Sequence, residues 1–187
     1  MKSESGSKAQ ASKWRLRHTL RRTASYRPIE DDDVKYAWAA YKKGALSPMG
    51  PAFDKEMNAA EFRELFEAFV IQNHHAAWTL IAPTHKGNIP VGIVLAAWAP
   101  NAPYMIVNGC CWFPWASNRN VIEAIVCFLN GVRKEHQLVF YALPEHKRTY
   151  EVCAMHGVVR RVGTSFVAVP GKQCAVFETF TKRPEAA

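Results

Sequence analysis

Residues 103–143 read as a strand–helix–strand unit: PYMIVNGCCWF (103–113), PWASNRN (114–120), VIEAIVCFLNGVRKE (121–135) and LVFYAL (138–143). The first and last segments are apolar and rich in β-branched and aromatic residues, as buried strands are. The third segment has apolar residues three and four apart, which predicts a helix with one core-facing side. Two strands joined by a helix of this length favour parallel pairing with a right-handed crossover.

The flanking sequence extends this unit in both directions. Before it, apolar spacing and capping residues predict two helices and two strands, at residues 31–41, 58–73, 77–82 and 89–99. After it, a helix and two strands are predicted at 145–156, 158–169 and 173–180, with Gly157 ending the helix. The order α-α-β-β-β-α-β-α-β-β predicts an α/β (α+β mixed sheet) protein, in which a central mixed β-sheet has a parallel strand pair and flanking helices.

The composition bounds the class of protein. The chain has 187 residues and a mass of 21.1 kDa, which suits one domain of ordinary size. With 49% hydrophobic and 21% charged residues it can form a core, which excludes a wholly disordered or fibrous protein. The longest uncharged stretch, between Lys86 and Arg119, is interrupted by prolines and asparagines, so we expect no integral membrane association. The first residues do not have the pattern of a secretion signal, so secretion is not expected.

The positive charge is concentrated at the N-terminus. The formal net charge is +8, and residues 1–27 carry +7 of it. We therefore expect a basic, flexible tail over residues 1–29, with a short helix at 13–24, and a nearly neutral domain over 30–187. Deletion of residues 1–27 is expected to leave that domain folded. The basic stretch 13–27 suits nucleic-acid phosphates, an anionic protein surface, a membrane surface or a transit peptide, and these alternatives stay open.

The cysteines and histidines do not point to a metal site. The five cysteines lack CxxC or any other zinc-type spacing, so we expect buried, reduced thiols in a cytoplasmic protein. The His74–His75 pair lacks a nearby carboxylate or an HxxxH spacing, and we interpret both residues as surface or helix-end histidines.

The order of elements over residues 31–182 resembles the GNAT superfamily of N-acyltransferases. In that family a loop of the form Q/R-x-x-G-x-G/A follows the strand that corresponds to 103–113, and its backbone amides hold the pyrophosphate of acyl-CoA. The two strands of the parallel pair also separate at their carboxyl ends. The corresponding loop here, which the resemblance implies as the acetyl-CoA site, is degenerate because asparagines replace the glycines. It consists of Trp115, Ala116, Ser117, Asn118, Arg119 and Asn120. The side chains of these asparagines are expected to crowd the phosphates.

The resemblance also implies a general acid on the helix at 145–156. Many members of the family place a tyrosine about four residues before a glycine, and counting back from Gly157 reaches Cys153 instead. Tyr150 lies one turn earlier on a similar face and is the second candidate. Cys153 has no neighbouring His or Arg to activate its thiol, so a core-filling role competes with a catalytic one. The carboxylate that serves as base in the family is missing from 103–113, and Glu123 is interpreted as a solvated or helix-capping side chain.

Three short strings, FPWASNRN (113–120), HGVVRRVGTS (156–165) and VFETF (176–180), are similar to acyltransferase-like proteins encoded by tailed bacteriophages. This likeness implies a phage-encoded N-acyltransferase that uses acetyl-CoA and an unidentified amine in the host cytoplasm. The alternative is a non-catalytic GNAT-fold protein of the virion, which would contact phage structural proteins or nucleic acid through residues 13–27. Catalytic activity itself stays an open question at this point.

Overall fold

Seven strands form one mixed sheet in the order β1-β2-β3-β4-β5-β7-β6. The strands are β1 (Ser25–Pro28), β2 (Ala76–Thr84), β3 (Gly87–Trp98), β4 (Tyr104–Trp112), β5 (Gln137–Ala142), β6 (Val159–Val169) and β7 (Lys172–Thr179). The β4–β5 pair is parallel and the other five neighbouring pairs are antiparallel. This computed structural model describes residues 23–73, 76–84, 87–142, 144, 147–169 and 172–179. The predicted mixed sheet with one parallel pair is confirmed.

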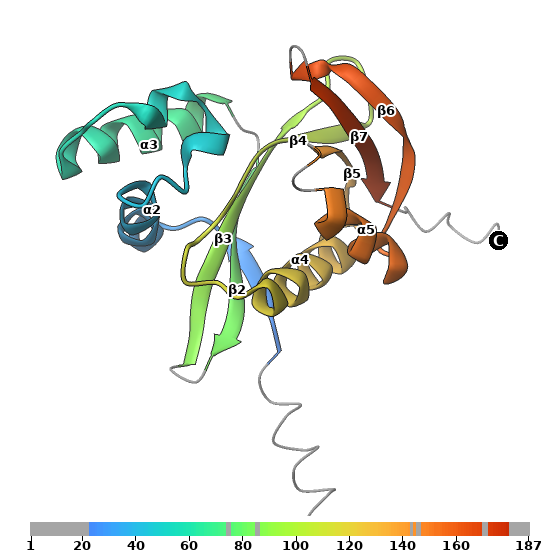
Figure 1. Ribbon diagram of the computed structural model, residues 1–187, viewed down its shortest axis with the longest axis horizontal. Coiled ribbons are helices and arrows are strands. Elements are labelled where there is room, and N and C mark those ends of the chain that lie inside the picture. Colours follow the sequence, from blue (N-terminus) through green and yellow to red (C-terminus); the bar gives the residue numbers. More distant parts are fainter. Residues whose placement is uncertain are drawn as a thin grey trace, which may run out of the picture.

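Helices cover both faces of the sheet (Figure 1). The helices α2 (Val34–Tyr41) and α3 (Ala59–Asn73) lie on one face, together with the short 3-10 helices η1 (Asp31–Asp33), η2 (Ser47–Met49) and η3 (Pro51–Asp54). The helices α4 (Asn118–Val132) and α5 (Lys147–Met155) lie on the other. Each face therefore has its own hydrophobic core, and α4 is the crossover between β4 and β5.

Most of the sequence-based boundaries agree with the structure to within a few residues. Asn58 caps α3: its Oδ1 accepts hydrogen bonds from the amides of Ala60 and Glu61 at 2.9 and 3.1 Å. Gly157 follows α5 in the left-handed conformation, with φ of 66°. The predicted helix at 13–24, apart from its last two residues, and the His74–His75 pair lie outside the described residues.

The sheet begins earlier in the chain than the sequence analysis places the domain. Strand β1, whose residues were assigned to the tail, pairs with β2 from Ser25 opposite Ile81 to Pro28 opposite Trp78. Tyr26 packs edge-on against Phe128 of α4, with ring centroids 5.4 Å apart. Deletion of residues 1–27 would remove three of the four residues of this strand together with their contacts to β2 and α4, and the expectation that the shortened chain still folds stays a prediction. The local sequence pattern does not predict this short strand, because its partner lies about fifty residues later in the chain.

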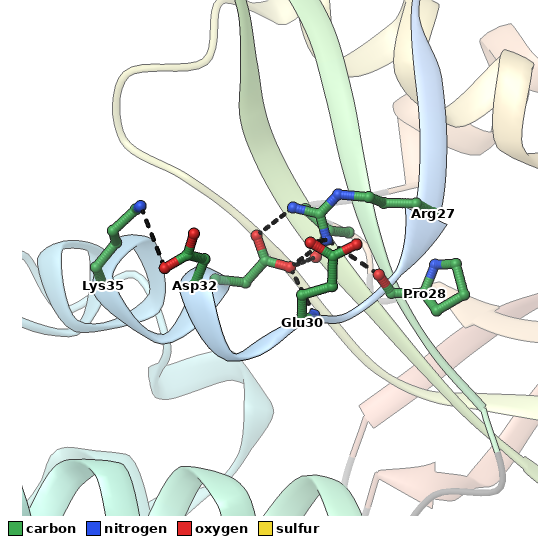
Figure 2. A network of polar contacts seen from close by, with 7 residues as sticks. Arg27, Pro28, Glu30, Asp32 and Lys35 are labelled. Atoms are coloured by element: carbon green, nitrogen blue, oxygen red, sulfur yellow. Dashed lines mark hydrogen bonds and ion pairs between the residues drawn. The ribbon is translucent and has the colours of Figure 1, made fainter.

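An ion pair between Arg27, whose side chain is 29% exposed, and the fully buried Asp33 joins β1 to the start of α2 (Figure 2). The Arg27 guanidinium donates two hydrogen bonds to the Asp33 carboxylate, at 2.7 and 2.9 Å. The Thr79 hydroxyl and the Glu30 amide also donate to Asp33, at 2.7 and 2.9 Å. Burial alone would raise the pKa of Asp33, but these hydrogen bonds outweigh it and hold the pKa below its usual value. The network therefore fixes how the chain passes from β1 into η1 and α2.

The parallel pair opens partway along its length. Pairing between β4 and β5 runs from Tyr104 opposite Gln137 to Val107 opposite Phe140 and then stops. Beyond Val107, β4 continues to Trp112 with β3 as its partner, while the end of β5 pairs with β7. In the β3–β4 pair, Leu95 lies opposite Gly109 and Ala96 lies opposite Val107. Asn108 therefore has no partner in the register and forms a bulge in β4. The predicted separation at the carboxyl ends of the two strands is therefore confirmed.

Candidate functional site

The first turn of α4 leaves backbone amides without acceptors. Ser117 is the N-cap, and its hydroxyl oxygen accepts from the amide of Asn120 at 3.2 Å. The Val121 amide donates to the Ser117 carbonyl at 3.0 Å. Within the described part of the chain, the amides of Asn118 and Arg119 have no hydrogen-bond acceptor. Free amides at the positive end of a helix dipole form a site suited to an anion.

The polar side chains of this turn differ in their hydrogen-bond and ion-pair partners. Arg119 is exposed and its Nε lies 2.7 Å from Glu123 Oε1, one helical turn later. The Asn120 side chain accepts from the Ser117 hydroxyl, and its Nδ2 donates to the Pro83 carbonyl at 3.4 Å. Asn120 is therefore engaged with its own cap and with the end of β2. Of the two asparagines that were expected to crowd an anion, Asn118 alone keeps an exposed side chain without such partners among the described residues.

Trp115 and Ala116 position this turn. The Trp115 indole donates from Nε1 to the Pro90 carbonyl at 2.8 Å, and its ring packs against Phe113 with centroids 4.9 Å apart. The Ala116 amide donates to the Phe113 carbonyl at 2.9 Å, which closes the chain reversal after β4. These contacts tie the entry of α4 to β3, so the free amides have a defined position.

A cleft of about 1330 Å³ is lined by the entry and first turns of α4 and by residues of α2, of the β2–β3 hairpin and of the segment before β1. Pockets for small ligands are typically about 300–1,000 Å³, so this open cleft can take a larger molecule. Its lining includes four of the six loop residues that the sequence analysis singled out. They are Trp115, Ser117, Arg119 and Asn120. The lining does not include Tyr150 or Cys153 among the described residues.

Tyr150 lies in the core where β4 and β5 separate. Its ring packs against Phe140 of β5 and Phe177 of β7, with centroids 5.3 and 5.6 Å away. Phe140 is the last residue of β5 that pairs with β4. The tyrosine hydroxyl shares a hydrogen bond with the thiol of Cys110, three residues beyond the last paired residue of β4. Tyr150 therefore spans the two strands at the point where they part.

The surroundings of Tyr150 keep its hydroxyl protonated. Burial, and then the nearby thiols of Cys110 and Cys153, hold the pKa of Tyr150 well above its usual value of 10.0. Burial also raises the pKa of Cys110 to about 12, and the hydrogen bond from Tyr150 offsets part of that rise. A thiol is a weak hydrogen-bond partner, so a buried phenol paired with one can still donate to a better acceptor.

Cys153 is a core residue. It is fully buried among the apolar residues between α4, α5 and the sheet. Burial raises the pKa of its thiol to about 12, which leaves almost no thiolate at neutral pH. This environment supports the core-filling interpretation over a nucleophile.

The structure adds Cys110 to the site and supplies no base. The bulge at Asn108 shifts the alternation of β4, so spacing in the sequence could not show that Cys110 faces Tyr150. Strand β4 contains no carboxylate, and the one buried acid in the described part of the chain, Asp33, is held by Arg27. No group of three or more metal-ligating side chains is found among the described residues. None of the described helices is long and apolar enough to cross a membrane.

The chain is similar to known proteins in structure but not in sequence. No family model matches the chain, and no curated protein matches it in sequence. An acetyltransferase of the GNAT family from Bacillus anthracis matches with a TM-score of 0.60 at 18% identity, over 86% of this chain and 96% of that chain. A spermidine N-acetyltransferase chimera of SpeG from Vibrio cholerae and hSSAT has a TM-score of 0.59 at 11% identity, with 85% and 96% covered.

A third structure, AAC(6')-Ib in complex with paromomycin and acetyl-CoA, matches with a TM-score of 0.59 at 10% identity, over 88% of this chain and 99% of that chain. At such low identities these likenesses show the fold alone. The chain has the GNAT fold, as its element order implied.

Proposed function

We propose that this protein is an acyl-CoA-dependent N-acyltransferase. The observation that carries the proposal is the Tyr150 hydroxyl, buried where β4 and β5 separate, whose partner among the described residues is a thiol. A group in this position has a proton to donate and no strong acceptor among the described residues. The fold supports the same activity, because several matching structures are acetyltransferases.

The residues present fit an acyl-CoA molecule at two points. The free amides of Asn118 and Arg119 suit a pyrophosphate, with Ser117 holding the turn in place. Among the described residues, the edge of β4 that faces β5 has no strand partner beyond Val107, so its backbone groups can bind the amides of a pantetheine chain. The acetyl-CoA in the AAC(6')-Ib structure makes acetyl-CoA the first compound to test.

The chemistry assigned to the protein is positioning and proton donation. Acyl-CoA supplies an acyl group activated as a thioester, which an amine can attack. Tyr150 stays neutral at pH 7 and donates a hydrogen bond or a proton toward a departing thiolate. Because its pKa lies above that of a thiol, hydrogen bonding contributes more than complete proton transfer. With no carboxylate on β4, we infer that the amine enters neutral or loses its proton to water.

The acceptor is an amine whose class the site does not identify. One matching protein is a spermidine N-acetyltransferase chimera and another forms a complex with paromomycin, so polyamines and aminoglycosides belong in a first panel of acceptors. Phage origin, a virion role and cytoplasmic location rest on the sequence alone and remain predictions.

Isothermal titration calorimetry of the full chain with acetyl-CoA tests the proposal. We expect one site with a dissociation constant in the micromolar range, followed by acetyl transfer to at least one amine of the panel. Binding weaker than millimolar would contradict the proposal and favour the non-catalytic alternative.

A further inference from the structure

One face of the sheet is open beyond β4. The core under α2 and α3 takes its strand residues from β2, β3 and β4, and no described residue of β5, β6 or β7 belongs to it. The other core contains Leu138, Phe140 and Ala142 of β5 and Phe177 of β7. Successive residues of a strand point to opposite faces, so the residues between these point to the side of α2 and α3. Figure 1 shows both helices on the far side of β4 from β6 and β7, so no described helix covers this part of the face.

The uncovered residues form an apolar strip with a single acid. Ile106, Val139, Tyr141 and Val176 are partly buried and belong to neither core. In the register, Val139 lies between Ile106 of β4 and Glu178 of β7, and Tyr141 lies opposite Val176. Among the described residues of β4, β5, β6 and β7, Glu178 is the one carboxylate. The strip therefore places one negative charge beside an apolar surface.

The Glu178 carboxylate can accept a further hydrogen bond. Its side chain is 15% exposed, and its Oε1 pairs with the guanidinium of Arg160. Its Oε2 accepts from Gln137 Nε2 at 3.3 Å. A carboxylate has about four lone-pair positions, so Oε2 can bind another donor. Arg160 is 60% exposed, and it is the cation with which a ligand would compete for this carboxylate.

Glu178 lies one strand away from the place where β4 and β5 part. It is opposite Val139, the residue before Phe140, at which the pairing of β5 with β4 ends. With strands about 4.8 Å apart and a rise of about 3.4 Å per residue, its backbone lies about 8–10 Å from the gap. On the other face the ring of Tyr150 packs on Phe140 and fills this place. An amine that attacks an acyl group in the gap therefore has open access from the side of Glu178.

We propose that Glu178 selects acceptors that carry a second positive charge. Its carboxylate binds one ammonium group of the acceptor while the reacting amine lies at the gap between β4 and β5. The inference rests on the proposed function, because the acceptor is the amine of that reaction. The substrate class is a diamine or polyamine, whose alkyl chain suits the apolar strip and whose second ammonium matches the single acid. Anionic acceptors are disfavoured by the same charge.

The test compares acetyl transfer to 1,4-diaminobutane and to 1-aminobutane, a monoamine with the same carbon chain. We expect kcat/KM of the wild type to favour the diamine by about tenfold. Glu178→Gln should remove this preference by raising KM for the diamine, with the monoamine and KM for acetyl-CoA unchanged. Glu151→Gln is the matched control and should change neither ratio, because Glu151 is 48% exposed on α5 and pairs with Lys147.

Arg160→Gln separates a binding role of Glu178 from a structural one. This change removes the cation that competes for the carboxylate, so we expect kcat/KM for the diamine to rise by about threefold. If Glu178 served only as the partner of Arg160, both variants would lower the Tm alike and neither would change the ratio of diamine to monoamine. That result would overturn the inference. Calorimetric titration of the free protein with 1,4-diaminobutane gives a second readout, and Glu178→Gln should weaken that binding.

The remaining outcomes distinguish this inference from the proposed function. Acetyl transfer with the same diamine preference in the wild type and in Glu178→Gln would overturn the inference and leave the proposed function standing. Absence of acetyl-CoA binding and of transfer to any amine would refute the proposed function, and this inference with it. A wild-type dimer that Val176→Asp dissociates in analytical ultracentrifugation would show that a second copy of the chain covers the strip, and would overturn the inference.

Discussion

Asp33 and Tyr150 are both buried polar residues, but they differ in how well the protein satisfies their hydrogen-bonding groups. The Asp33 carboxylate accepts four hydrogen bonds, two of them from Arg27, and has no exposed surface (Figure 2). The Tyr150 hydroxyl has, among the described residues, the Cys110 thiol as its partner. The Asp33 carboxylate is satisfied within the protein, whereas the Tyr150 hydroxyl has a weak partner near the point where β4 and β5 stop pairing.

Under the proposed function, this difference separates a structural role for Asp33 from a catalytic one for Tyr150. A buried charge with all its acceptor positions filled contributes to the stability of the native state, and removing it leaves its partner uncompensated. A buried donor with a weak acceptor gains little for the fold, so its presence is better explained by a ligand. The two helix entries on opposite faces show the same contrast. At the entry of α3, Asn58 Oδ1 accepts from the amides of Ala60 and Glu61, and Glu61 accepts from the amide of Asn58. At the entry of α4, the amides of Asn118 and Arg119 have no acceptor among the described residues.

The largest expected effect is the loss of stability on substitution of Asp33. Asp33→Asn removes the charge that holds Arg27 and should lower the free energy of unfolding by about 3 kcal/mol. Asp32→Asn is the matched control, because Asp32 is 84% exposed and pairs loosely with Lys35 at 3.7 Å, so it should cost less than about 0.5 kcal/mol. Urea denaturation of both variants measures the difference. Equal stability in the two would show that the buried network is dispensable.

The second effect is expected in the rate of acyl transfer. Tyr150→Phe keeps the ring between Phe140 and Phe177 and should reduce kcat by about 100-fold, with KM for acetyl-CoA little changed. Its Tm should stay within a few degrees of the wild type, because the lost partner is a thiol. Tyr104→Phe, at the far end of β4, is the control and should leave the rate unchanged. A Tyr150→Phe variant with full activity would remove this residue from the mechanism.

The third effect concerns the two helix entries. Asn118→Asp places a carboxylate beside the free amides of α4 and should weaken CoA binding by about tenfold through like-charge repulsion. Ala59→Asp places the same charge at the first residue of α3 and should leave CoA affinity unchanged. Both changes complement a helix dipole, so neither should lower the Tm of the ligand-free protein. Calorimetry and thermal melts with and without CoA measure these quantities, and an equal effect of both variants on CoA would contradict the assignment.

The smallest effect is the pH dependence of the Arg27–Asp33 pair. The pKa of Asp33 is lowered in the folded state, so its contribution to stability is complete above the unfolded-state pKa of about 3.9. That contribution is lost as the pH falls through the lower folded-state pKa. The stability difference between the wild type and Asp33→Asn should therefore be constant near neutral pH and shrink in acid. A difference that grows below pH 4 would be inconsistent with a lowered pKa.

The sequence alone determined the order and bounds of the elements from residue 31 onward, because these depend on near neighbours in the chain. Apolar spacing marks α4, Asn58 marks the start of α3, and Gly157 marks the end of α5. The parallel pairing of β4 and β5 also followed from the length of their connection. The resemblance in element order was then sufficient to imply the fold.

Tertiary structure alone decided which of these residues come together. Tyr150 and Cys153 are three residues apart on one helix face, so periodicity cannot rank them. The structure buries both in one core and packs the Tyr150 ring against Phe140, the last residue of β5 that pairs with β4. The bulge at Asn108 turns Cys110 toward Tyr150, and β1 joins the sheet through a partner strand distant in the chain. These features depend on register and on long-range packing, which a linear pattern of residue types does not encode.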